Sequence, residues 1–207
     1  MFSNTGNEQE EQKAVLIKFV FIGDKNTGRS NTVLRYIENV FVELYIPIIP
    51  MDFKIKSFED LDSEYTLYLQ VWDRINDWDR FRLIAPTFYK NASAVFVFFD
   101  ITNRESFNHV EKEIKDFQRI NQLEYELYIV GNKIDLENKR VISREEGYQL
   151  AQANAAQYFE ISAKENINIH PTFDEIAKAM FYKKINDLKT NEPSVDPPVS
   201  KSYCIIQ

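Results

Sequence analysis

The sequence has little glycine, one cysteine, no long apolar run and no excess of positive charge. Its 207 residues include five glycines, and the formal net charge is −7. A single cysteine excludes an internal disulfide and suits a reducing compartment. No run reaches the roughly 18 apolar residues that span a bilayer. The acidic balance argues against nucleic acid as a partner, because nucleic-acid binders usually carry a basic face.

What is present indicates one folded domain between two polar ends. With 44% hydrophobic and 28% charged residues, the chain has enough apolar material for one full core. Residues 1–12 are polar and acidic, so we expect a disordered N-terminus rather than a signal peptide. Residues 189–207 carry three prolines at 193–198 and no periodic apolar face, which predicts a flexible tail. The domain is therefore expected over residues 13–188.

Within that domain, strand-like and helix-like segments alternate. Apolar or alternating patterns predict strands, and the segments at 51–59 and 65–72 resemble a hairpin; the expected strands are 14–23, 51–59, 65–72, 93–100, 126–131 and 157–162. Helical spacing and start signals predict four helices, at 31–40, 106–120, 143–156 and 171–188. We expect Ser106 to cap the second helix, and Ser143 and Glu146 to form a capping box at the start of the third. This order predicts an α/β fold with a mostly parallel sheet and helices on both faces. Ligands then bind where the strands end.

The loop after the first strand reads GDKNTGRS, residues 23–30. It matches the phosphate-binding pattern G-x-x-x-x-G-K-[ST] except at Arg29, which stands where lysine is expected. Backbone N–H groups near a helix start suit phosphates, and Ser30 suits Mg²⁺. Arg29 keeps the charge, but its forked guanidinium does not simply replace a compact ammonium. The predicted phosphate-binding residues are Gly23, Asn26, Thr27, Gly28, Arg29, Ser30 and Asn31.

Two later loops predict a site for guanine. Residues 132–135 read N-K-x-D, and Ser162, Ala163 and Lys164 follow the next strand. The Asp135 carboxylate can accept two hydrogen bonds from N1–H and the 2-amino group of guanine, a pair that adenine does not offer. The stem of Lys133 can lie along the base, and the Ala163 N–H can meet O6. Such polar discrimination is strong, because a wrong base leaves buried groups unpaired. We therefore predict a guanine nucleotide as the ligand, with Asn132 as part of the same loop.

Together these motifs resemble the Ras superfamily of small GTPases, and within it the Rab family. The resemblance covers residues 13–188, and the Rab-like segments are MDFKIK, LQVW, RFRLIA, FYKNA and VFFDIT. It implies a P-loop NTPase G domain with a six-stranded sheet. It also implies that Phe41 packs on the guanine, that Tyr45 covers the phosphates, and that Asp73 holds Mg²⁺ through water. The same resemblance implies effector and regulator proteins as partners, and a role in vesicle traffic at the cytosolic face of an endomembrane.

The two switch segments depart from the family pattern. Ile48 stands where the family has the threonine that ligates Mg²⁺, and no threonine lies between Thr32 and Thr66. The second switch should read D-T-A-G-Q-E, but residues 73–79 read DRINDWD, one residue longer before Arg80. The segment from 29 to 130 contains no glycine, and residues 71–117 contain no glutamine. The water-orienting glutamine and the glycine hinge are therefore missing in any register.

Because hydrolysis in this family depends on positioning and charge neutralisation, loss of the water-orienting group is expected to slow it by about 10²-fold or more. We expect a guanine-nucleotide-binding protein with weak hydrolysis and a blunted switch, and we assign no catalytic residue. Two alternatives stay open. Arg29 and Ser30 compensate and the switch is ordinary, or the domain is an interaction module that no longer binds nucleotide.

The chain ends in Cys204-Ile205-Ile206-Gln207, which has the C-a-a-X form of a prenylation site. In residues 189–203 two lysines balance Glu192 and Asp196, so the tail offers no polybasic second anchor. A single lipid without such help binds membranes only marginally. We therefore predict a reversible, prenyl-mediated membrane association through Cys204 that depends on a partner protein, with part of the protein in the cytosol.

Overall fold

In the computed structural model, the described residues are 12–43, 52–74, 85–121 and 123–191, and they form a sheet of six strands. The strand order is β2-β3-β1-β4-β5-β6. β2 pairs with β3 in antiparallel fashion and every other pair is parallel. The strands are β1 Lys13–Gly23, β2 Asp52–Phe58, β3 Tyr65–Asp73, β4 Ala94–Asp100, β5 Glu126–Asn132 and β6 Gln157–Ile161. The predicted α/β fold with a six-stranded, mostly parallel sheet is confirmed.

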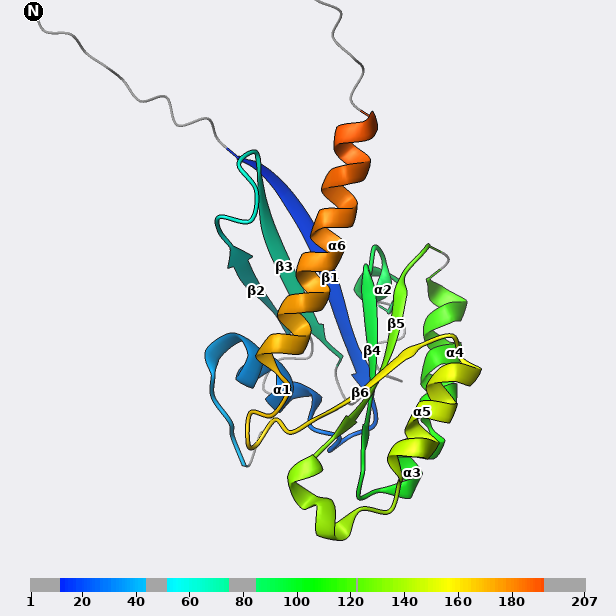
Figure 1. Ribbon diagram of the computed structural model, residues 1–207. Coiled ribbons are helices and arrows are strands. Elements are labelled where there is room, and N and C mark those ends of the chain that lie inside the picture. Colours follow the sequence, from blue (N-terminus) through cyan, green and yellow to red (C-terminus); the bar gives the residue numbers. More distant parts are fainter. Residues whose placement is uncertain (1–11, 44–51, 75–84, 122, 192–207) are drawn as a thin grey trace, which may run out of the picture.

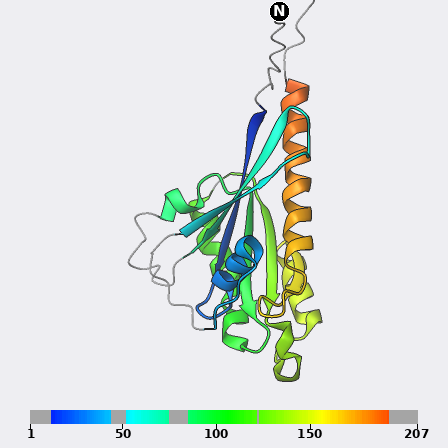
Figure 2. The ribbon, with the colours of Figure 1, turned by 90° about the vertical axis from the view of Figure 1, so that its left-hand side faces the viewer.

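Helices cover both faces of the sheet (Figure 1). Two of them, α1 Arg29–Glu38 and α6 His170–Asn191, pack on one face. The other face is covered by α2 Ala85–Tyr89, α4 Val110–Ile120 and α5 Arg144–Ala153. The remaining elements are the short helices α3 Arg104–Asn108 and η2 Ile134–Lys139. Figure 2 shows α6 lying along one side of the sheet.

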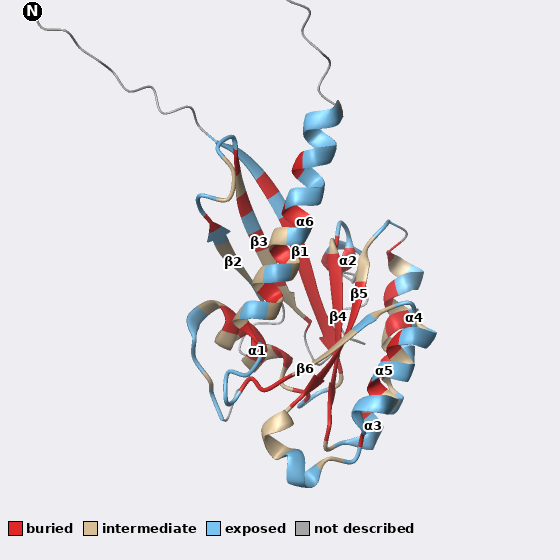
Figure 3. Cartoon of the chain, viewed as in Figure 1, coloured by how far each residue is buried: buried red, intermediate tan, exposed pale blue. Residues whose placement is uncertain are grey.

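The two-sided cover explains the continuous apolar runs of the central strands. In β4, Phe96 and Phe98 face the layer of α1 and α6, whereas Val95, Val97 and Phe99 face the opposite layer. All seven residues of β4 are buried (Figure 3). Successive side chains of a strand point to opposite faces, so a strand covered on both faces needs apolar residues at nearly every position.

Several helix boundaries differ from the sequence predictions: α1 covers 29–38 rather than 31–40, and α5 ends at Ala153 rather than at 156. The expected helix at 106–120 is divided into α3 and α4 at His109, and the N-cap of α3 is Asn103 rather than Ser106. The Asn103 side chain accepts hydrogen bonds from the backbone N–H groups of Glu105 and Ser106, while the Ser106 hydroxyl is buried against the end of β4. Helix α6 continues to Asn191, beyond Leu188, where the change in composition predicts the end of the domain.

Other local predictions are confirmed. β2 and β3 form the expected hairpin. Ser143 and Glu146 form the capping box of α5 through reciprocal hydrogen bonds. The parallel strands β1, β3, β4, β5 and β6 end at one edge of the sheet, so the predicted loops are brought together there. In the part of the chain that the structure describes, no helix is both long enough and apolar enough to cross a bilayer.

Candidate nucleotide site

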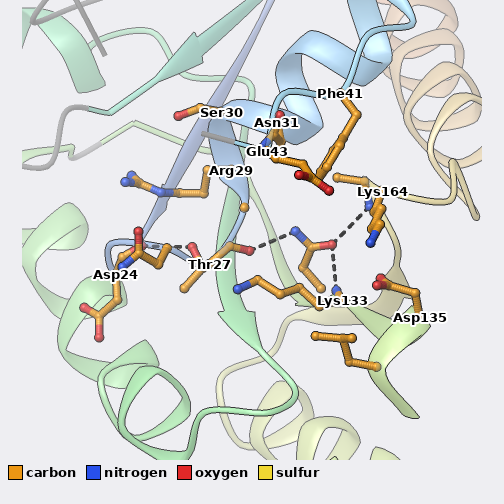
Figure 4. A pocket seen from close by; sticks show the side chains of 15 residues that line it. Asp24, Thr27, Arg29, Ser30, Asn31, Phe41, Glu43, Lys133, Asp135 and Lys164 are labelled. Atoms are coloured by element: carbon orange, nitrogen blue, oxygen red, sulfur yellow. Dashed lines mark hydrogen bonds between the residues drawn. The ribbon is translucent and has the colours of Figure 1, made fainter. Parts of the chain in front are cut away.

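A cavity of about 340 Å³ opens at this edge of the sheet (Figure 4). It lies among the loop after β1, the start of α1, the chain following α1, and the loops after β5 and β6. Twelve of the residues predicted from the sequence line it: Asn26, Thr27, Gly28, Arg29, Ser30, Asn31, Phe41, Asn132, Lys133, Asp135, Ala163 and Lys164. The fold therefore gathers the predicted phosphate and base residues around one space.

Asn132 connects the three loops that surround the cavity. Its side-chain amide is buried and donates to the Thr27 carbonyl oxygen at 2.8 Å. Its Oδ1 accepts from the backbone N–H of Lys133 at 2.8 Å and of Ala163 at 3.3 Å. One side chain thus sets the positions of the phosphate loop and of both base loops. The Ala163 N–H, expected to meet guanine O6, has Asn132 as a partner that we did not predict.

Gly28 is required where the phosphate loop passes Asn132. Its φ is +87°, and a Cβ at this position would lie 2.3 Å from the Asn132 Nδ2 atom. Any side chain would therefore be strained and would press on the amide that joins the loops. Gly28 also precedes the first residue of α1 and offers no side-chain cap. The first N–H groups of a helix lack intrahelical partners, so an anion at this end of the cavity can accept hydrogen bonds from them.

At the base end of the cavity, Asp135 is oriented by Ser162. The Ser162 hydroxyl donates to Asp135 Oδ1 at 2.6 Å and accepts from the Glu165 N–H at 3.0 Å. Ser162 is fully buried and lies behind the cavity wall rather than in it. Lys133 forms an ion pair with Asp100 Oδ2 at 2.7 Å. The carboxylate that is expected to read guanine is thus held by a neighbouring loop.

Helix α1 supports the loop after β6 from outside the cavity. The Arg35 guanidinium donates to the carbonyl oxygens of Ala163 at 3.0 Å and Lys164 at 3.2 Å. Asn31, also on α1, holds the following chain, because its side chain both donates to and accepts from the Val42 backbone at 2.9 Å. This pairing places Phe41, which lines the cavity, on the base side (Figure 4).

At the phosphate end, Arg29 is buried, with 4% of its surface exposed. Its guanidinium points away from Lys133 and Asp135 (Figure 4). Burial lowers the pKa of Arg29, and the nearby Asp73 carboxylate opposes that shift. Because a guanidinium stays protonated in proteins, Arg29 is a buried cation at the end of the cavity where phosphates are expected.

The two predicted metal ligands are in contact, since the Ser30 hydroxyl donates to the Asp73 carboxylate. Mg²⁺ prefers hard oxygen ligands and usually takes one or two from the protein, the others coming from phosphate and water. A hydroxyl beside a carboxylate fits that requirement. The described residues contain no group of three or more His, Cys, Asp or Glu side chains placed to hold a metal, so a site at Ser30 and Asp73 would depend on the nucleotide for further ligands.

Arg74, the residue after Asp73, is also buried, and it joins three elements. Its guanidinium pairs with both carboxylate oxygens of Glu113 on α4, at 2.5 and 2.6 Å, and donates to the Gly23 carbonyl oxygen at 3.1 Å. It also lies 3.3 Å from the Tyr89 hydroxyl of α2. Burial is the largest single influence and alone would lower the pKa of Arg74, but the hydrogen bonds and charge interactions with Glu113 and Tyr89 together outweigh it, and the pKa is raised.

Some predicted residues lie elsewhere. Gly23 ends β1 outside the cavity lining, and with a φ of +134° its Cβ position would be 2.3 Å from the Phe98 carbonyl oxygen. Tyr45, Ile48, the changed second-switch residues from Ile75 onward, and Cys204 lie outside the described residues. Their assigned roles stay predictions.

Three lining residues were missed by the sequence reasoning: Asp24, Glu43 and Leu136. Asp24 and Leu136 directly follow the predicted residues Gly23 and Asp135, so their positions in the motifs could have indicated that they line the cavity. Glu43 lies between the predicted residues Phe41 and Tyr45, but its residue type did not indicate a place in the cavity wall. Its carboxylate is turned toward the cavity beside Phe41 (Figure 4) because Asn31 fixes the chain at Val42.

Comparison with known proteins agrees with the motifs. A model of the Ras family matches residues 18–182. The chain is 37% identical to the Ras-related protein Rab-1 of Theileria parva over 180 residues, which cover 86% of this chain and 80% of that protein. It is 33% identical to human Ras-related protein Rab-3A over 180 residues, 87% of this chain and 80% of the relative. For chicken Ras-related protein Rab-8A the identity is 35% over 178 residues, 86% of this chain and 84% of the relative.

Proposed function

Since this chain belongs to the Ras family and is a Rab-like small GTPase, we propose that it binds GDP and GTP in the cavity described above. Proteins of this family bind these nucleotides with Mg²⁺. The observation that supports the proposal is the placement of Asn132, which joins the phosphate loop to both base loops. Guanine would lie at the end with Asp135 and Phe41, and phosphates at the end with Gly28, Arg29 and Ser30.

The direct test is the nucleotide content of freshly purified protein, followed by calorimetry with GDP, GTP and ATP in Mg²⁺. We expect bound guanine nucleotide and a preference of at least 10³-fold over ATP, because Asp135 pairs only with guanine. Equal competition by ATP would refute the base assignment. If no nucleotide is held and GTP with Mg²⁺ gives no thermal shift, the domain is an interaction module instead.

Within the nucleotide cycle, we propose that hydrolysis is weak. When bound, Mg²⁺ neutralises charge on the β- and γ-phosphates, and the chain's own residues place Ser30 beside Asp73. The sequence has no glutamine between residues 71 and 117 to orient the attacking water and no threonine at position 48. Single-turnover hydrolysis by purified protein tests this. Turnover equal to that of ordinary Rab proteins, alone or with an activator, would contradict it and favour a normal switch in which Arg29 compensates.

We also propose a role in vesicle-mediated membrane traffic, with effector and regulator proteins as partners. Membrane attachment would be reversible and prenyl-mediated through Cys204, at the cytosolic face of an endomembrane. The support is the family membership and the C-a-a-X ending. Fractionation of cells that express Cys204→Ser protein is the test. Loss of the membrane-bound fraction is expected, and an unchanged distribution would show that Cys204 is not the anchor.

A further inference from the structure

We propose that Arg74 is a positioning residue that holds the Asp73 carboxylate beside Ser30 by fastening the end of β3 to the phosphate loop and to α4. The inference rests on the proposed binding of guanine nucleotide with Mg²⁺. It gives a role to a residue that departs from the family pattern, since Arg74 stands at the threonine of D-T-A-G-Q-E.

The contacts of Arg74 fix both its backbone and its side chain. Its backbone N–H donates to the Phe21 carbonyl oxygen at 3.1 Å, and its guanidinium donates to the Gly23 carbonyl oxygen at 3.1 Å. Both acceptors belong to the end of β1, just before the phosphate loop. The second anchor is the two-point pairing with Glu113. A planar guanidinium paired at two points is restrained in direction as well as in distance.

This restraint acts next to a candidate metal ligand. Asp73 is the last residue of β3, and its carboxylate already meets the Ser30 hydroxyl. A chain held immediately after Asp73 restrains the backbone that carries this carboxylate, while the Ser30 hydroxyl restrains the side chain itself. Arg74 itself is 8% exposed, so its charge pair is shielded from the solvent and is weakened little by salt.

The chain has a particular need for such a restraint. Ile48 supplies no oxygen where the family uses threonine, which leaves Ser30 and Asp73 as the predicted protein ligands. With fewer ligands, affinity depends more on each one being placed before the ion arrives, because ordering a mobile ligand costs free energy at binding. Arg74 would supply that order from the protein rather than from the nucleotide.

The start of α4 also holds the other side of the phosphate loop. His109, between α3 and α4, has its Nδ1 atom 2.6 Å from Asp24 Oδ2, and Asp24 lines the cavity. His109 and Glu113 are four residues apart and therefore lie on the same side of the helical turn. The phosphate loop and Arg74 are thus both held by the first turn of α4.

The experiment measures the Mg²⁺ concentration that half-maximally slows release of a fluorescent GDP analogue. Arg74→Thr, which restores the family residue, is expected to raise it at least tenfold, and Glu113→Gln about threefold. Arg140→Thr is the matched control, because Arg140 makes a similar two-point pair with Glu160, at 2.8 and 2.8 Å, away from the metal ligands. It should change the half-maximal concentration less than twofold. Melting temperatures are recorded for every variant.

A lower melting temperature with an unchanged Mg²⁺ requirement would show that Arg74 is only structural and would overturn the proposal. If Arg74→Thr does not fold, Glu113→Gln decides the question in the same way. If the wild-type protein holds no GDP, the proposed function fails by itself. In that case, amide hydrogen exchange at Asp73 and Arg74, measured without metal or nucleotide, tests whether Arg74 restrains the end of β3. Exchange at least tenfold faster in Glu113→Gln than in Arg140→Thr supports the restraint, and equal exchange rejects it.

Discussion

The two ends of the cavity are built in different ways. At the base end, Asn132 accepts hydrogen bonds from the backbone N–H groups of Lys133 and Ala163, and the Ser162 hydroxyl donates to Asp135. These residues match the family motifs. At the phosphate end, Arg29 and Arg74 lie buried near Asp73 and Glu113, and neither arginine is the family residue. The residues of the base end can therefore keep the family motifs while those of the phosphate end change, because different loops supply the two halves.

The substitution Asp135→Asn changes the base end alone and is expected to have the largest effect. The amide can still accept from Ser162, but its NH₂ group faces guanine N1–H, so one acceptor is lost and two donors oppose each other. We expect GDP affinity to fall about 10³-fold or more with little change in melting temperature, as measured by calorimetry.

The control for this variant is Glu137→Gln, which changes an exposed carboxylate in the same 3₁₀ helix, where it pairs with Arg140. Its GDP affinity should stay within about threefold of the wild type. Retention of tight GDP binding by Asp135→Asn would mean that the base end does not read guanine.

Gly28→Ala tests the joint between the two ends. The new Cβ would occupy a left-handed φ and press on Asn132 Nδ2, so the hydrogen bond to Thr27 would break. We expect a loss of about 2–3 kcal/mol in the free energy of unfolding together with weaker GDP binding. Urea denaturation measures the first and calorimetry the second.

Asn26→Gly is the matched change in the same loop. Asn26 has a φ of +64°, where glycine is relaxed, so stability should be unchanged or slightly higher. Equal stability of the Gly28→Ala and wild-type proteins would show that the loop tolerates a side chain at this position.

Arg29→Lys tests the phosphate end separately from the base end. A lysine would restore a compact ammonium as a phosphate ligand, so we expect roughly tenfold tighter GDP binding, the worth of about one added charge-assisted hydrogen bond. The preference for GDP over ADP should not change, because that preference is set at the other end. A variant that binds GDP more weakly than the wild type would show that the guanidinium is the better fit here.

The smallest expected effect concerns Lys18, which lies beneath α2. Its ammonium is 4.0 Å from the centre of the Trp72 ring and donates to the Lys90 carbonyl oxygen at 3.1 Å. Burial lowers the pKa of Lys18 to about 8, below its ordinary value in the unfolded chain. Between these values the unfolded chain binds more protons, so the contribution of Lys18 to stability rises with pH.

We therefore expect the stability difference between wild type and Lys18→Met to shift by about 1 kcal/mol in favour of wild type from pH 8 to pH 9. Urea titrations at each pH give that difference, and the subtraction removes the other groups that titrate in this range. A constant difference would mean that the ammonium stays charged, held by Trp72 and the helix end.

Much of the fold could be predicted because local sequence patterns indicate where the strands and helices lie. The continuous apolar runs of β1, β4 and β5 indicated strands covered on both faces, and the capping box of Ser143 and Glu146 marked the start of α5. The divided helix at His109 could not be read this way. Ser106 is as good a cap as Asn103 by residue type, and only the packing of Ser106 against the end of β4 decided between them.

The sequence was enough to predict the order of strands and loops along the chain and most of the residues that line the cavity. The lining could be predicted because parallel strands bring their carboxyl ends to one edge of the sheet. The tertiary structure alone decided the partners. Asn132 meets Thr27 across 105 positions of chain, and Arg74 meets Glu113 across 39. Such pairings depend on how elements pack in three dimensions, and no local spacing or periodicity records them.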